Sequence, residues 1–514
     1  MDKKAIRKFD ILAIIILILM CYAITPIYFP NDTFYSIKVG LQILQNGIDM
    51  KDHFAWHEDL PYTYPHWAYD AFIGLLYNWG GFSAICISTI VLACILGVSI
   101  YFVNIALTKN RLTSLVTAIM IIFLLGENFI TTRAQLVSYI LFMAELYCIE
   151  QFLESKRIRF AVGLIIIAAI LANIHIAVWP FFFVLFLPYI GEFGIAVIRD
   201  LPLLSRISFL FTNMYKVEIG KNRNTSYLIL IFVICLFTGF LTPIGFSPYT
   251  YLYKSIAGPS LGLINEHQPL VVIQSLKAMF VILLFLMFLT FTNNKIRLKD
   301  LFMVGGLILL ALWGQRHISL LYIIGMTIIN QLICNYLNKD LSEISEIVQK
   351  FFITLKGKII AISTMLLAAV LLTIPKLHQD FFSEIIFPEG TCDFIVENMD
   401  VNNMKLFNGY DYGSYLLFRE IPVFIDSRAD LYTKKFNGKK DIFPDYSDIM
   451  RIKTHYETKF AEYGITHVIL HKTTSLNVIL EQDERYKELY SDEFFVLYER
   501  ISNSDNKNIE NNLK

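Results

Sequence analysis

Charge is scarce in this sequence. Lys, Arg, Asp and Glu make up 17% of its 514 residues, well below the roughly 25% of an ordinary soluble domain. The 44 basic and 44 acidic residues cancel, so no global basic field argues for a nucleic-acid partner. Seven cysteines are scattered without a CxxC pair, which supports neither a zinc site nor a disulfide framework.

Several common catalytic motifs are also missing. The sequence holds no P-loop, GxSxG, HExxH, Rossmann glycine pattern or kinase motif set in a credible context. This absence argues against soluble nucleotide chemistry.

Long hydrophobic runs are what the chain has in abundance. Hydrophobic residues make up 55% of it, and its mean hydropathy is +0.53. A bilayer core needs about 20 mostly apolar residues per helix, and this measure predicts a polytopic α-helical membrane protein with about 11 transmembrane helices. The expected spans lie near 11–29, 81–106, 112–127, 133–152, 159–172, 176–190, 226–243, 270–291, 299–313, 316–335 and 358–376.

Basic residues give the expected orientation. Lys and Arg cluster before the first span and again in the connections at 108–111, 154–159 and 293–299, as the positive-inside rule expects of cytoplasmic segments. An odd number of spans then places residues 377–514 outside. We therefore predict a cell-membrane protein with a cytoplasmic N-terminus and an extracytoplasmic C-terminal domain.

The composition becomes ordinary after the last span. We expect a transmembrane domain over 1–376, a small extracytoplasmic α/β domain over 377–500 and a disordered polar tail over 501–514. Within the α/β domain, "PVFI" and "THVILH" read as buried strands, and "YKELYSDEFFVLYER" reads as a strand pair.

The first outer loop begins with an acid, Asp32, immediately after the first span. Two amphipathic stretches follow, at 33–47 and 64–81, and are expected to lie as helices on the outer surface of the membrane. The ordinary explanation of Asp32 is a helix N-cap. The functional alternative is a catalytic or metal-binding carboxylate at the membrane surface.

Further ionisable side chains fall at the outer ends of predicted spans. Charged groups there are costly, so each is a functional candidate. Snorkelling or capping explains any one of them alone, but an acid and base set on one face favours a single outward-opening site. The predicted catalytic set is Asp32, Arg133, His175, Glu266, His267 and Arg316.

Other residues are candidates for substrate binding. The "FIDSRADLY" loop brings Asp426 and Arg428 together, either as a self-paired salt bridge or as a lid against the membrane groove. His53, which could alternatively ligate a transition metal with His57, belongs to the first loop, where Trp67 suits the lipid–water boundary. Tyr410, in "NGYDYGSY", can stack on a sugar.

The order of these features resembles the C-type glycosyltransferase superfamily, which includes oligosaccharyltransferase catalytic subunits, protein mannosyltransferases and the transferases that add aminoarabinose to lipid A. More narrowly, the chain looks like an uncharacterised bacterial branch of that superfamily. The matching stretches are "NDTFYSIKVGLQILQNG", "YPHWAYDAFIGLLYNWGG", "RAQLVSY", "NIHIAVWP", "INEHQPL", "NGYDYGSYLLF", "PVFIDSRADLY" and "YGITHVIL".

The resemblance implies transfer of a sugar from a polyprenyl-phosphate donor to an envelope glycan, lipid or protein on the outer leaflet. In that superfamily the acid after the first span acts on the acceptor or holds a metal, and here it is Asp32. No cofactor is certain, but a divalent cation, Mg²⁺ or Mn²⁺, held by Asp32 and Glu266 is the metal that this set would suit.

Chemistry gives each group a role. Asp32 would accept the proton of the attacking hydroxyl, and Arg133 and Arg316 would stabilise the leaving phosphate, since Arg can engage two oxygens at once. His175 and His267 would assist as donors. A single direct displacement would invert the anomeric centre. Membrane lipids are the other expected partners, and nucleic acid is not one.

Two other functions fit the same sequence. A transporter or flippase for lipid-linked glycans would carry polar or Pro/Gly-broken helices near the bilayer midplane, whereas most charges here lie at span ends. A non-catalytic envelope assembly protein would tolerate replacement of Asp32 by Asn.

Overall fold

The computed structural model describes residues 3–200, 216–256, 264–271, 273, 275–292, 295–336, 346–348, 350–351, 354–376 and 379–501. The chain forms two compact units. We call one the helical unit (Met1–Ile27, Ile85–Tyr249 and Asn265–Gln379) and the other the mixed unit (Tyr28–Ala84, Thr250–Ile264 and Asp380–Lys514).

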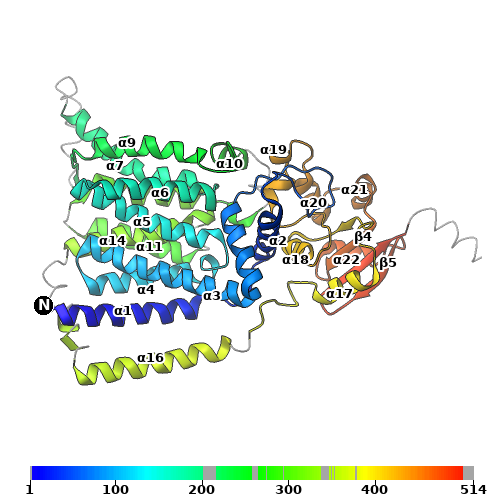
Figure 1. The fold of residues 1–514 in the computed structure, drawn as a ribbon, viewed down its shortest axis with the longest axis horizontal. Coiled ribbons are helices and arrows are strands. Elements are labelled where there is room, and N and C mark those ends of the chain that lie inside the picture. The colour runs from blue at the N-terminus through cyan, green and yellow to red at the C-terminus, as the bar shows by residue number, and fades with distance from the viewer. Residues whose placement is uncertain are drawn as a thin grey trace, which may run out of the picture. The chain divides into compact units, whose positions relative to one another are not determined.

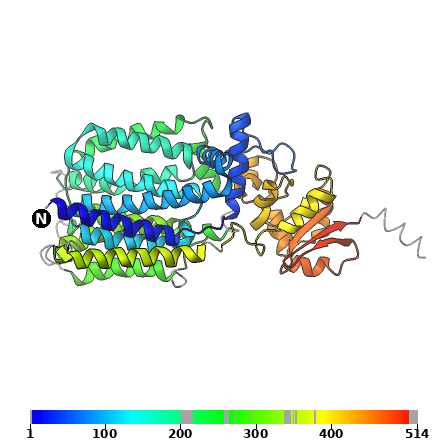
Figure 2. The same cartoon turned by 60° about the horizontal axis from the view of Figure 1, so that its bottom comes forward.

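The helical unit is a set of long apolar helices. Figures 1 and 2 show them lying side by side, and α1 contacts both α4 and α16, α5 packs on α6, and α7 packs on α12. Their bounds are α1 Lys3–Ile24, α4 Arg111–Phe129, α5 Ala134–Ser155, α6 Ile158–Ile174, α7 Trp179–Arg199, α9 Thr225–Leu236, α11 Leu276–Phe291, α12 Leu298–Trp313, α14 Met326–Tyr336 and α16 Leu355–Lys376.

A helix lies at each of the expected spans, counting the C-terminal part of α3, Trp67–Thr108, and the run Gln315–Tyr336 that ends in α14. Among the described residues, five helices or helical runs are long and apolar enough to cross a membrane. The class of polytopic helical membrane protein is therefore confirmed, and the number of spans stays a prediction.

The helix α3 is two helices joined at a break. Gly80 and Gly81 have non-helical backbone angles, and Gly81 has a φ of 61°, a left-handed conformation that glycine adopts without penalty. The C-terminal part, 82–108, holds no charged residue and is the part with spanning character. The N-terminal part, 67–79, belongs to the mixed unit, and its place on the membrane surface stays a prediction.

One end of the helical unit is held by buried charges. Glu192 accepts from Arg297 at 2.7 Å and from the backbone N–H of Gly220 at 3.2 Å. Glu150 accepts from Tyr189 at 2.7 Å and pairs with Lys299. Both basic members come from the connection 293–299, which the charge rule assigns to the cytoplasm, so these pairs tie that connection to α7 and α5.

The mixed unit combines the first loop with the C-terminal segment. Its sheet has the order β3-β4-β6-β5; β3 and β4 are parallel, and the other pairings are antiparallel. The strands are β3 Leu406–Phe407, β4 His467–His471, β5 Tyr486–Ser491 and β6 Phe495–Arg500, and the helices are α2 Asn31–Asn46, the first part of α3, α17 Glu389–Asn398, α18 Tyr410–Phe418, α20 Ile442–Met450, α21 Tyr456–Tyr463 and α22 Ser475–Leu480.

Aromatic side chains explain why residues 28–84 join this unit. Phe34 of α2 is fully buried, and its ring centroid lies 5.1 Å from that of Tyr415 on α18 and 5.0 Å from that of Phe387. Burial of one such ring contributes about 1.5–3 kcal/mol. The sequence gives no direct sign of this pairing, because the partners lie more than 350 residues apart.

The predicted α/β character of the C-terminal segment is confirmed. β4 coincides with "THVILH", and β5 and β6 form the expected pair. The prediction of a strand at "PVFI" is wrong, because the segment is buried but forms only an isolated bridge between Val423 and Ala55. The predicted tail, 501–514, lies outside the described residues apart from Ile501, and the domain boundary at 377 stays a prediction.

Candidate functional site

Four of the six predicted catalytic residues form two contacting pairs in the helical unit. Arg133, at the N-cap of α5, donates through Nη1 to Glu266 Oε1 at 2.9 Å. Arg316 Nη1 lies 2.9 Å from His267 Nε2. These four of the six predicted residues, which come from three segments of the chain, therefore lie together, and we call them the arginine–histidine cluster.

Backbone hydrogen bonds hold the two loops of this cluster together. The N–H of Gln315 donates to the carbonyl of Gln268 at 3.0 Å, and the N–H of Leu270 donates to the carbonyl of Leu312 at 3.2 Å. The short helices η4, Asn265–His267, and η6, Gln315–His317, are thereby fixed side by side. The position of the functional groups is set by backbone pairing as well as by the ion pair.

The charges of the cluster fix its protonation. Partial burial favours the neutral form of Glu266, but Arg133, and then His267 and Arg316, lower the pKa of that carboxyl, which stays ionised. Burial, and secondly Arg316, lowers the pKa of His267 to about 4. His267 is thus neutral at pH 7, so its Nε2 accepts from Arg316 and its Nδ1 carries the proton. That Nδ1 is buried and has no hydrogen-bond partner.

His175 occupies a turn of the same unit. It caps the C-terminus of α6, where its backbone N–H donates to Leu171, and its Nδ1 lies 3.1 Å from the Ser138 hydroxyl of α5. The ring is buried. Its predicted role as a donor in catalysis stays a prediction.

Asp32 lies in the first turn of α2, in the mixed unit, and is half-buried. The N-cap position is held by Pro30, and no side chain makes a capping hydrogen bond there. The explanation of Asp32 as an N-cap is therefore wrong. The neighbouring Asn31 donates through Nδ2 to the carbonyl of Tyr410 at 3.0 Å, which fixes the start of α2 against α18.

The predicted substrate-binding residues all lie in the mixed unit. His53 Nε2 lies 2.6 Å from Asp49 Oδ2, Trp67 begins α3 and is half-buried, and the Tyr410 hydroxyl donates to the carbonyl of Ser427 at 3.2 Å. Their role in substrate binding stays a prediction.

Asp426 and Arg428 form a buried ionic group. Arg428 donates through Nε and Nη2 to the two oxygens of Asp426, at 2.9 and 2.7 Å, and through Nη1 to Asp52 at 2.5 Å. Tyr432 donates to the same Asp426 at 2.5 Å. This is the self-paired alternative of the sequence analysis, extended to the first loop by Asp52.

A carboxylate that the sequence analysis did not select lies beside α2. Asp70, in the first turn of α3, has 0% of its surface exposed, and neither carboxylate oxygen has a hydrogen-bond partner. Burial raises the pKa of this carboxyl; the Ser36 hydroxyl and the Arg428 charge oppose the shift, and the Asp32 charge adds to it. In the sequence, the four-residue spacing of Asp70 and Gly74 indicates that both lie on one face of the helix. It does not indicate which segment covers that face.

A divalent cation finds no complete ligand set here. Among the described residues, no three His, Cys, Asp or Glu side chains lie close enough together to hold a metal ion. Glu266 is paired with Arg133, and Asp32 belongs to the other unit. The described residues thus show no set of ligands that fits a metal, and we derive no step through one.

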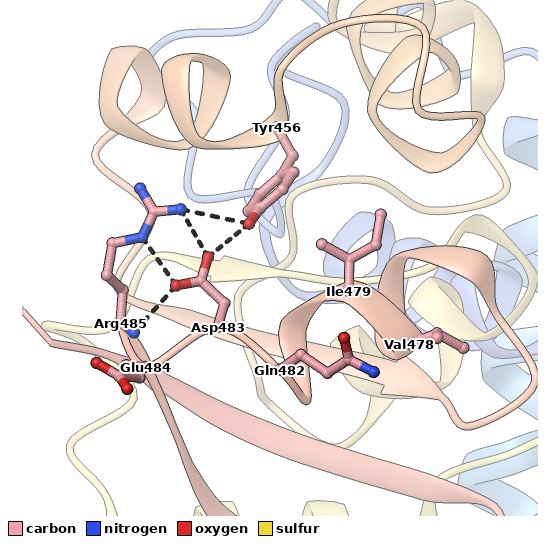
Figure 3. A pocket seen from close by; sticks show the side chains of 7 residues that line it. All are labelled: Tyr456, Val478, Ile479, Gln482, Asp483, Glu484 and Arg485. Carbon is pink, nitrogen blue, oxygen red and sulfur yellow. Dashed lines mark hydrogen bonds and ion pairs between the residues drawn. The ribbon is translucent and has the colours of Figure 1, made fainter.

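An open pocket with a volume of about 600 Å³ lies on the mixed unit between α21 and α22 (Figure 3). Two of its charged members are paired: Arg485 donates to both oxygens of Asp483, at 2.8 and 2.6 Å, and Tyr456 donates to Asp483 at 2.5 Å. The network ties α21 to the start of β5, which gives these residues a structural role.

Comparison with known proteins gives one informative result. No protein-family model and no curated protein matches the sequence. Among solved structures, the chain is similar to an oligosaccharyltransferase of Archaeoglobus fulgidus that was tethered by a disulfide bond to an acceptor peptide containing the NVT sequon. The TM-score is 0.55 at 10% identity, and the match covers 96% of this chain and 74% of the other. The resemblance expected from the sequence is thus confirmed at the level of the fold.

Proposed function

Given this shared fold, we propose that the chain is a membrane glycosyltransferase that moves a sugar from a polyprenyl-phosphate donor to an envelope acceptor on the outer face of the membrane. The observation that carries the proposal is the arginine–histidine cluster, since fold alone does not define a reaction. Two guanidinium groups, a neutral imidazole with an unpartnered N–H and a carboxylate converge from separate segments.

The cluster suits a departing phosphate. Displacement at the sugar C1 leaves a phosphate oxygen with increased negative charge, and preorganised cationic donors stabilise such charge most effectively where water is partly excluded. Arg133 and Arg316 supply the positive charge, and the Nδ1–H of His267 supplies a neutral donor. Glu266 holds Arg133 in place and offsets one of the two positive charges of the cluster, which leaves a positive charge for the phosphate.

Asp32 is the proposed base. A carboxylate in the first turn of a helix is stabilised as an anion by the helix N-terminus, and it can take the proton of an acceptor hydroxyl. Direct attack of that hydroxyl on C1 forms the new glycosidic bond while the C1–O bond to phosphate breaks. The anomeric centre is inverted, and the lipid phosphate leaves as an anion.

Deletion and complementation test this function. Loss of the gene should remove one envelope glycan and raise the amount of its lipid-linked sugar, and the wild type should restore both. Asp32→Asn and Arg316→Ala should fail to restore them, whereas Arg199→Ala, which removes a surface ion pair with Asp200 and a long hydrogen bond to the carbonyl of Ile219, should succeed.

The other outcomes separate the alternatives. Accumulation of the lipid-linked sugar in the inner leaflet alone would indicate a flippase, and full restoration by Asp32→Asn would indicate an assembly protein. Normal glycans in the deletion strain would contradict all three functions: transferase, flippase and assembly protein. The anomeric configuration of the product, compared with that of the donor, checks inversion.

A further inference from the structure

Two helices of the mixed unit cross at a pair of glycines. A Cβ on Gly40 of α2 would lie 1.9 Å from the backbone carbonyl oxygen of Asp70, and a Cβ on Gly74 would lie 2.7 Å from the carbonyl carbon of Gly40. The backbones of α2 and α3 therefore touch at this point. Only residues without a side chain allow such an approach.

This crossing places one acid beside another. Asp32, Ser36 and Gly40 lie four residues apart and share one face of α2, and Asp70 and Gly74 share one face of α3. Because Gly40 and Gly74 are in contact, the residues one and two turns before them lie along the same seam. The charge of Asp32 accordingly acts on Asp70.

The surroundings of Asp70 do not compensate a negative charge. The groups that act on it are the Ser36 hydroxyl, the Asp32 carboxylate on α2 and the Arg428 guanidinium, which is already bound by Asp426 and Asp52. Burial, and secondly the charge of Asp70, raises the pKa of Tyr62, whose buried hydroxyl has no hydrogen-bond partner. An ionised carboxylate that is buried without a partner is strongly disfavoured.

We propose that Asp70 is the neutral, proton-carrying member of a carboxyl pair with Asp32, so that Asp32 remains the charged member. When two carboxyls are close, one of them takes up a proton, and the more buried one does so more readily. Asp70 is thus a positioning residue that acts through Asp32. This role rests on the proposed function of Asp32 as the base.

Infrared spectroscopy of the purified full-length protein tests the pair without an assay of transfer. The spectrum at pH 7 should contain a protonated-carboxyl band that shifts in ²H₂O and is absent from Asp70→Asn. Asp32→Asn should keep the band but lose it at a pH about one unit lower, because the neighbouring negative charge no longer favours the proton. Glu145→Gln, which removes another buried carboxyl on α5, should leave this band unchanged.

The proposal is overturned if Asp70→Asn lacks an ionised-carboxylate band of the wild type instead of the protonated-carboxyl band. An unchanged titration in Asp32→Asn would also overturn it, and this second variant decides the matter if Asp70→Asn does not fold. If Asp32→Asn transfers sugar normally while the infrared results hold, the base assignment fails and the carboxyl pair stands.

Discussion

Arg428 donates to Asp52 at 2.5 Å although the two residues are 376 positions apart in the chain. Both side chains are almost fully buried, and Asp426 completes the ionic group. Aromatic rings cover it: the guanidinium carbon lies 5.2 Å from the centroid of Phe54 and 4.9 Å from that of Tyr62. The first loop and the C-terminal segment are thereby joined by a contact that depends on a buried charge.

Removal of that charge should destabilise the protein. We expect Arg428→Met to lower the free energy of unfolding by about 3–5 kcal/mol, because two buried carboxylates would lose their cation. Lys440→Met, which breaks a half-exposed pair with Glu462, should change it by about 1 kcal/mol or less. Thermal unfolding of both variants in detergent measures the difference, and equal effects would show that the Arg428 group contributes no more than a surface pair.

The sequence predicted the helices far better than the contacts between distant segments. Apolar runs and charge flanks located a helix at every expected span because both signals are local. For Arg133 and Glu266 the sequence predicted only that both lie at the same face of the membrane, and not that they form a pair. The Arg428–Asp52 contact and the burial of Asp70 could not be predicted, because each depends on which distant segment covers a given face.

Replacement of Gly40 should disrupt the crossing of α2 and α3. We expect Gly40→Leu to lower the free energy of unfolding by roughly 1–3 kcal/mol, as overpacking does, and to abolish glycan transfer, because α2 carries Asp32. Gly305→Ala is the control, since a Cβ there meets open space and alanine favours the helix. A Gly40→Leu variant with wild-type stability would show that the helices can separate without loss.

Two half-buried histidines should make the protein sensitive to acid. Burial lowers the pKa of His57 and of His267 to about 4, whereas an unfolded His binds its proton near pH 6.5. Between pH 6.5 and 4 the unfolded state therefore binds more protons, and stability falls as the pH falls. Each group contributes on the order of 3 kcal/mol to this loss.

Replacement by a neutral residue should reduce that dependence. Each of His57→Gln and His267→Gln should flatten the decline in Tm between pH 6.5 and 4, and the double variant should flatten it more. The difference in Tm between each variant and the wild type above pH 6.5 measures separately the stability lost with the contacts of the histidine. Parallel curves for the wild type and the double variant would mean that neither histidine stays neutral in the folded protein.

The first part of α3 presents an apolar stripe. Phe72, Leu75 and Trp79 are 40%, 57% and 83% exposed, and their spacing places them on one helical face. We expect this face to contact lipid at the membrane interface, where tryptophan is favoured. Brominated lipids should therefore quench Trp79, and Trp79→Phe should remove that quenched component.

Trp56→Phe provides the matched control. The Trp56 Nε1 donates to the carbonyl of Leu406 at 2.9 Å, so its ring is held within the mixed unit. Its replacement should leave the quenched fraction unchanged. Quenching that persists in Trp79→Phe and disappears in Trp56→Phe would place the lipid contact elsewhere in this unit.

The predicted orientation can be tested with two single cysteines. Val478 in α22 is 55% exposed and should lie outside the cell, whereas Arg157 lies between α5 and α6 in a connection that its cations assign to the cytoplasm. In intact cells a membrane-impermeant maleimide should label Val478→Cys and spare Arg157→Cys; permeabilisation should expose both. The wild type, whose seven cysteines are all free, gives the background, and labelling of Arg157→Cys alone would reverse the orientation and remove Asp32 from the outer leaflet.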